Sequence, residues 1–155
     1  MRRFISMLIF LLLVVGCSDK NDQELIWFDT PDDAIQYGVQ QEGITVSDIL
    51  AREERDGESL IIYKIKLSEG TGLGVASLAR ENGKYAWYRA DQPVLVQYSS
   101  TENTPVIKIV ISTFTKKSFT IYLGSTKDPN KTINTDKGTV SPTINKNEGL
   151  LYYIE

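Results

Sequence analysis

Carboxylates are the side chains of this sequence that could do acid–base chemistry, because the chain contains no histidine. That absence excludes Ser-His-Asp and Cys-His catalysis and removes the commonest zinc ligand. A glycosidase needs two carboxylates held a fixed distance apart across a cleft. Arg52 and Arg55 are interleaved with the one dense acidic group, which favours a solvated surface and argues against an enzyme. That group comprises Glu53, Glu54, Asp56 and Glu58.

Segment 128–136 places oxygen-bearing side chains at alternate positions, as calcium loops do. Calcium takes six to eight oxygen ligands, and an EF-hand loop that began at Asp128 would need glycine at its sixth position and glutamate at its twelfth. Ile133 and Thr139 stand at those positions, and only Asp128 and Asp136 supply carboxylates. We therefore expect a solvated loop, with no metal and no cofactor.

A run of aromatic residues, Tyr85, Trp87 and Tyr88, ends at Arg89 and could form a platform for a sugar or a peptidoglycan fragment. Aromatic residues also dominate ordinary β cores and cross-strand pairs. Strand alternation puts Tyr85 and Trp87 on one face and Tyr88 on the other. We expect Trp87 in the core, and we take Tyr88 and Arg89 as the candidate ligand-binding residues on the surface.

Cys17 is the only cysteine, and it stands where an apolar run ends. Arg2 and Arg3 precede the run Phe4–Val15, which is apolar except for one serine. A basic start, an apolar middle and small residues before a cut site are typical of a secretory signal. The run is too short for a membrane-spanning helix, which needs about 20 apolar residues. The sequence Val14-Val15-Gly16-Cys17 resembles the lipobox of bacterial lipoproteins.

In lipobox proteins the cysteine thiol is linked to a diacylglycerol, and the peptide bond before the cysteine is cut. The resemblance implies that Cys17 becomes the first residue and that two acyl chains hold the protein stably on a membrane. We therefore predict a signal peptide over residues 1–16, a lipidated cysteine with a flexible tether over 17–25, and a single α+β domain over 26–155. The expected location is the extracytoplasmic face of the cell membrane.

Composition narrows the partners of the predicted mature chain. Removal of residues 1–16 leaves 139 residues with 15 basic and 20 acidic side chains, a net charge of −5. This mild acidity argues against nucleic acid, for which a basic patch is expected. No cysteine pair remains, so stability must come from burial of apolar side chains. The length suits one domain with a real core.

The elements begin with a helix. Thr30 can cap it, Pro31 suits its first turn, and Gly43 is a plausible stop, so the sequence predicts a helix over Pro31–Glu42. Beyond Gly43 the hydrophobic period changes to two, which predicts an antiparallel sheet of about six to eight strands built from hairpins. Asp56-Gly57 and Asn82-Gly83 are typical of two-residue hairpin turns.

The fold class that we predict is α+β, mostly β. Asp48–Arg55 is either the hairpin partner of the run Ile61–Leu67 or the start of a second helix. Segment 125–147 is expected to be a long loop with one weak strand near Thr139–Thr143. The remaining strands are expected at Leu73–Arg80, Lys84–Ala90, Val94–Tyr98, Val106–Phe114, Phe119–Leu123 and Leu150–Ile154.

The order of these pieces resembles small lipoproteins of Gram-positive, Bacillus-like bacteria. The resemblance lies in Thr30–Ile35, in Gly72–Ala76 and in Asn82–Arg89. It implies an exported cell-surface protein and carries over no catalytic residue.

The leading functional hypothesis is a non-enzymatic, lipid-anchored domain that binds an envelope protein or a cell-wall component through an exposed sheet face or edge. A carrier of a small hydrophobic or envelope-derived ligand is the alternative, and it requires an apolar cavity between the helix and the sheet. A carboxylate-based hydrolase comes third.

Overall fold

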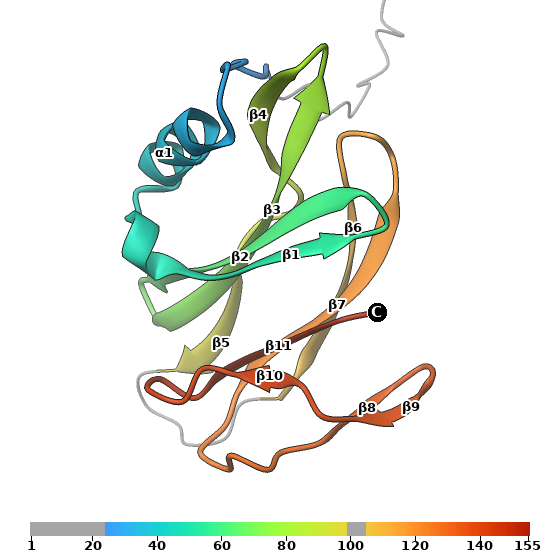
Figure 1. Ribbon diagram of the computed structural model, residues 1–155. Helices are drawn as coiled ribbons and strands as arrows, with labels where there is room; N and C mark the ends of the chain where they lie inside the picture. Colours follow the sequence, from blue (N-terminus) through green and yellow to red (C-terminus); the bar gives the residue numbers. More distant parts are fainter. Residues whose placement is uncertain (1–23, 99–104) are drawn as a thin grey trace, which may run out of the picture.

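The computed structural model describes residues 24–98 and 105–155, which form one α-helix, two facing β-sheets and a small two-stranded sheet (Figure 1). Residues 1–16, Cys17 and most of the expected tether lie outside the described residues, so the expected domain division stays a prediction. Within the described ranges, no helix has the length and apolar character that crossing a membrane requires.

Strands dominate the described chain, at 54% strand and 12% helix, which confirms an α+β, mostly β fold. The helix α1 spans Pro31–Glu42, and a short 3₁₀ turn, η1, spans Val46–Asp48. The described strands are β1 (Ile49–Arg55), β2 (Glu58–Leu67), β3 (Gly70–Glu81), β4 (Lys84–Arg89), β5 (Val94–Tyr98), β6 (Ile107–Ser112), β7 (Ser118–Ser125), β8 (Ile133–Thr135), β9 (Gly138–Val140), β10 (Thr143–Ile144) and β11 (Leu150–Ile154).

The helix begins and ends where the sequence predicts. The Thr30 hydroxyl accepts a hydrogen bond from the Asp33 amide at 3.1 Å, which satisfies one of the free amides of the first turn. At the other end Gly43 adopts φ 68°, and its amide bonds back to the carbonyl of Gln40. A left-handed glycine after the last helical residue is a common way to end a helix.

The first sheet has the order β1-β2-β3-β4, and β5 pairs with the part of β3 that β4 leaves free. Asp56 and Gly57 join β1 to β2, and Asn82 and Gly83 join β3 to β4, each pair at φ 50° and 77°. Positive φ at both central residues is the geometry of a type I′ turn, so both predicted hairpins are confirmed. Of the segment Asp48–Arg55, Asp48 ends η1 and Ile49–Arg55 form the strand β1, which settles the strand-or-helix alternative in favour of the strand.

This first sheet is buried on both faces. Leu60 and Ile62 of β2 pack with the second sheet, while Ile61 and Tyr63 pack with the face that α1 covers. The molecule therefore has three layers, with the first sheet between α1 and the second sheet (Figure 1).

The second sheet has the order β10-β11-β7-β6. In β6, Ile107, Ile109 and Ile111 face the core, and Ile111 is fully buried. Val110 on the opposite face is 63% exposed. The strand expected at Val106–Phe114 is thus present over Ile107–Ser112, with the period of two that the sequence predicts beyond Gly43.

The described residues form eleven strands, which corrects the expected six to eight. The additional strands lie in the segment that we expected to be mostly loop. Where one weak strand was expected near Thr139–Thr143, the structure has two short strands, β9 and β10, and β8 precedes them. The β8–β9 hairpin folds onto the second sheet, where the Asp136 amide donates to the Tyr122 hydroxyl at 3.2 Å and Lys108 pairs with the Asp136 carboxylate at 2.5 Å. These contacts come from residues distant in sequence, which local patterning does not reveal.

Candidate functional site

A cleft of about 730 Å³ opens beside the last residues of β2. Lys64, Ile65, Lys66 and Leu67 form its floor. Gly43, Ile44 and Asp48, the last residue of η1, line one side of the cleft, and Asn147 and Glu148 line the opposite side. The cleft therefore lies where three separate parts of the chain meet.

The floor of the cleft is an open sheet edge. β1 starts at Ile49, opposite Tyr63, so among the described strands only β3 pairs with Lys64–Leu67. An added strand could continue the line of β1 along this edge. At about 3.3 Å per residue, the four floor residues offer roughly 13 Å of edge.

The direction of the floor amides follows from the two hairpin turns of β2. Arg55↔Glu58 and Leu67↔Gly70 close two-residue turns, and such pairs exchange both backbone hydrogen bonds. Counting in steps of two from either turn gives the same result, with even-numbered residues of β2 facing β1 and odd-numbered residues facing β3. The backbone N–H and C=O of Lys66 therefore point to the open edge.

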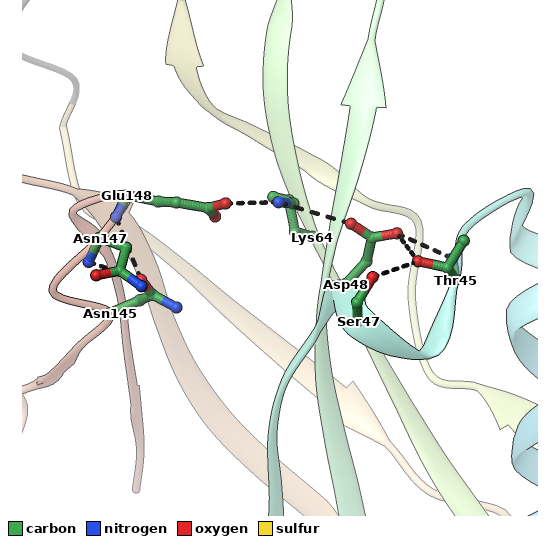
Figure 2. A network of polar contacts seen from close by, with 7 residues as sticks. All are labelled: Thr45, Ser47, Asp48, Lys64, Asn145, Asn147 and Glu148. Carbon is green, nitrogen blue, oxygen red and sulfur yellow. Dashed lines mark hydrogen bonds and ion pairs between the residues drawn. The ribbon is translucent and has the colours of Figure 1, made fainter.

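The η1 side of the cleft is held by a capping box. The Thr45 amide and hydroxyl both donate to the Asp48 carboxylate, at 2.9 and 2.7 Å (Figure 2). These two bonds to Thr45 hold the pKa of the Asp48 carboxyl below its usual value, and Lys64 adds to the effect. Asp48 is therefore a fixed negative charge at neutral pH.

The opposite side is a tight turn between β10 and β11. The Asn145 side-chain oxygen accepts hydrogen bonds from the amides of Asn147 and Glu148, at 3.0 and 3.2 Å. Gly149 closes the turn at φ 68°, where a Cβ would come within 2.2 Å of the Thr126 carbonyl oxygen. This turn therefore holds Glu148 at the cleft with little freedom.

Lys64 links the two sides, as Figure 2 shows. Its Nζ lies 2.6 Å from Glu148 Oε1 and 3.6 Å from Asp48 Oδ1. The hydrogen bond to Glu148 raises the pKa of the Lys64 ammonium, against the opposing effect of burial. The ammonium of Lys64 is thus paired with two carboxylates. Lys66, by contrast, is exposed and forms no ion pair with a carboxylate of the described chain.

Tyr88 and Arg89, the predicted ligand-binding residues, lie on opposite faces of β4. Arg89 forms an ion pair with Glu42 at the end of α1, in which Nε and Nη2 each lie 2.8 Å from a carboxylate oxygen. This pair links the helix to the sheet. Tyr88 stacks edge-on against Phe114, with ring centroids 6.2 Å apart. The structure does not bring the two side chains together into one platform.

The space between α1 and the first sheet is filled by side chains. Trp87, only 3% exposed as predicted for a core residue, lies on Gly38 so closely that a Cβ there would come within 2.0 Å of the indole. Tyr63 lies in the same way over Gly74. The Trp87 indole N–H donates to Glu42 at 3.2 Å, and burial together with the nearby Glu42 charge raises the pKa of Tyr63. This interface is a packed core with a buried polar pair.

The acidic group near the first hairpin does not form a pair across a cleft. Glu54 contacts Arg52, and Glu53 accepts a hydrogen bond from the Tyr152 hydroxyl at 3.0 Å. The expectation of a solvated surface is wrong for Glu58. This residue is only 5% exposed, and its carboxylate accepts a hydrogen bond from the Thr115 hydroxyl at 2.5 Å. Its burial ties β2 to the β6–β7 turn.

In segment 128–136 the two carboxylates have local partners. Asp136 binds Lys108, and Asp128 accepts a hydrogen bond from the Asn130 amide at 2.9 Å. Over residues 24–98 and 105–155, no three Asp, Glu, His or Cys side chains gather closely enough to hold a metal ion.

Sequence reasoning missed the Lys64 cleft, because its sides come from residues up to 84 positions away from Lys64. One signal was present, since the apolar run of β2 continues past the point where its partner strand starts. The comparisons add no functional assignment: family models, curated proteins and solved structures were searched, and none matches this chain.

Proposed function

We propose that this chain is a non-enzymatic, lipid-anchored binding domain on the extracytoplasmic face of the cell membrane, and that it binds an extended segment of an envelope protein at the open edge of β2. The anchor rests on the lipobox at Cys17. The binding mode rests on one observation, the cleft whose floor turns the backbone groups of Lys64 and Lys66 to an open sheet edge.

An extended peptide recognises such an edge through its main chain. Strand addition supplies main-chain hydrogen bonds for affinity, and side-chain pockets supply specificity. Both sides of this cleft are fixed before binding, η1 by its capping box and the β10–β11 turn by Asn145. A rigid site loses little conformational entropy when a partner binds.

The positive charge at the floor of the cleft indicates which side chain the bound peptide segment has there. Lys64 is engaged by Asp48 and Glu148, whereas Lys66 is exposed beside the open backbone. Residues directly opposite in an antiparallel pair have Cβ atoms about 4.5–5.5 Å apart, and opposite charges there are favourable. We therefore expect an acidic residue of the partner opposite Lys66.

The packed helix–sheet interface favours this mode over a carrier of a hydrophobic ligand, since Trp87 and Tyr63 fill the space that such a ligand would need.

Proline at position 66 tests the binding mode. A photo-crosslinking amino acid at Ser68, which lines the cleft, reports partners in intact cells. Lys66→Pro removes the outward N–H without breaking the β2–β3 ladder, because proline is tolerated where the N–H of an edge strand faces solvent. Lys66→Ala keeps this N–H. We expect a defined adduct with the native sequence, retained in Lys66→Ala with reduced yield and lost in Lys66→Pro.

Two controls accompany this experiment. The same crosslinker at Lys137, exposed on the β8–β9 turn, should not give the Ser68 adduct. Thermal unfolding of each purified variant should show that Lys66→Pro is folded. An adduct that persists at full yield in Lys66→Pro would refute recognition through the backbone, and no adduct at Ser68 in the native chain would refute the cleft as the binding site.

A further inference from the structure

We infer that the end of the domain formed by Ile26, Trp27, Tyr88 and Phe114 lies against the lipid surface and fixes the orientation of the β2 cleft. This end is called the aromatic end below. The inference rests on the proposed anchor at Cys17, and its occupant is the bilayer interface.

The aromatic end gathers apolar groups from three parts of the chain. Trp27 packs edge-on against Phe114 of the β6–β7 turn, with centroids 5.5 Å apart, and Phe114 packs in turn against Tyr88 of β4. All three rings are partly exposed, and the neighbouring Ile26 is 47% exposed. Tryptophan and tyrosine favour the interface between a membrane and water, because one part of each ring system is apolar and another part is polar.

The length of the tether holds this end close to the membrane. Seven residue steps separate Cys17 from Glu24, the first described residue, and even a fully extended chain spans only about 25 Å over that length. Leu25, Ile26 and Trp27 follow at once, so the described chain begins with apolar side chains close to the anchor. A diacylglycerol at Cys17 thus brings the aromatic end to the bilayer at high local concentration.

Positive charge accompanies the aromatic rings. Lys116 lies in the same turn as Phe114 and is exposed. Lysine beside an exposed aromatic residue suits a surface of phosphate headgroups, because its stem contacts apolar groups while its ammonium stays in the polar layer.

The β6–β7 turn also shows where the cleft lies relative to the aromatic end. The Lys117 ammonium donates to the Asp56 carbonyl and lies 3.7 Å from the Glu58 carboxylate, so the β6–β7 turn adjoins the start of β2. Lys66 lies eight residues further along β2, roughly 26 Å away at about 3.3 Å per residue. In Figure 1 the β6–β7 turn and the β2–β3 turn lie at opposite sides of the molecule. With the aromatic end on the bilayer, the cleft opens toward partners away from it.

Tryptophan fluorescence tests this contact, because the chain has two tryptophans in contrasting places. The lipidated full chain is reconstituted in vesicles of phosphatidylcholine and phosphatidylglycerol, with bromine atoms at shallow or deep positions of the acyl chains. We expect shallow bromines to quench the native emission more than deep ones. In Trp27→Phe only Trp87 emits, and its burial should leave it unquenched. Ile26→Ser, which keeps both tryptophans, should show weaker quenching than the native chain.

Flotation of the same vesicles reports the anchor separately. Native protein that floats with the vesicles and shows no more quenching than Trp27→Phe would overturn the membrane contact while leaving the anchor in place. Native protein that does not float would overturn the anchor and, with it, this inference. Equal quenching by shallow and deep bromines would also contradict an interfacial position of Trp27.

Discussion

At the scale of single residues, Gly38 sets how closely α1 approaches the sheet. Alanine there would gain about 1 kcal/mol of helix propensity. Its Cβ would meet the Trp87 ring at 2.0 Å, and the indole is held by Glu42 and flanked by Tyr63. Overpacking of a dense core costs typically 1–3 kcal/mol. We therefore expect Gly38→Ala to lower the free energy of unfolding, as measured by urea denaturation.

Gln40→Ala is the matched control, because Gln40 is exposed on the same helix. Its effect should stay within about 0.5 kcal/mol. A stabilised Gly38→Ala variant would show that the helix can shift away from Trp87 at no cost, and would refute close packing as the role of this glycine.

Which residue types lie in the core follows from the sequence, whereas the pairing of polar residues does not. Its aromatic character within the strand predicts Trp87 as a core residue. The ion pair of Arg89 with Glu42 joins positions 47 apart, so only the docking of α1 on the sheet creates it. Burial of Glu58 likewise depends on the distant Thr115. Polar residues that sequence patterning assigns to the surface become partners when a second layer covers them.

At the scale of elements, β6 allows a graded test of the two faces of the second sheet. Ile111 is fully buried, Ile109 is partly buried on the same face, and Val110 is 63% exposed. Replacement of a buried isoleucine by alanine costs about 2–5 kcal/mol. We expect Ile111→Ala to lie in that range, Ile109→Ala at its lower end, and Val110→Ala within about 0.5 kcal/mol of the native protein.

Chemical denaturation of the three purified variants gives this order directly. Each changes the same strand, so the comparison cancels differences in strand propensity. Equal losses at Ile109 and Val110 would mean that β6 is not anchored to the core in this register, and a small loss at Ile111 would contradict the packing of the two sheets.

Sequence patterning predicts a helix or strand when the residues of that element, or of its turn, are sufficient to form it. The Asp-Gly and Asn-Gly turns fix two hairpins, and counting in twos from the Asp-Gly turn gives the outward direction of the Lys66 amide. The short strands β8, β9 and β10 lack a hydrophobic period, and the β8–β9 hairpin is held by contacts to Tyr122 and Lys108. The start of β1 at Ile49, which leaves the edge open, depends on the Thr45 capping box that shapes η1. The cleft therefore could not be predicted from alternation alone.

At the scale of the whole molecule, two separate parts of the surface have different proposed roles, membrane contact and peptide binding. The aromatic end faces the bilayer, and the β2 cleft lies at the other end of a ten-residue strand. This arrangement requires the anchor to be attached at the end of the domain where the described chain begins. The anchor at Cys17 is thus the assumption on which the orientation depends.

Lipidation of Cys17 can be measured without reference to the rest of the domain. In cells fed a fatty acid with a clickable alkyne, we expect the native chain to become labelled and Cys17→Ala to remain unlabelled, because alanine has no thiol for the diacylglycerol. Ser18→Ala, one residue further on, keeps the thiol and should be labelled as the native chain is. Equal labelling of Cys17→Ala, or none of the native chain, would contradict the lipobox. Two acyl chains anchor a protein stably, whereas one gives only marginal binding, so the labelled chain should also stay with membranes through a high-salt wash.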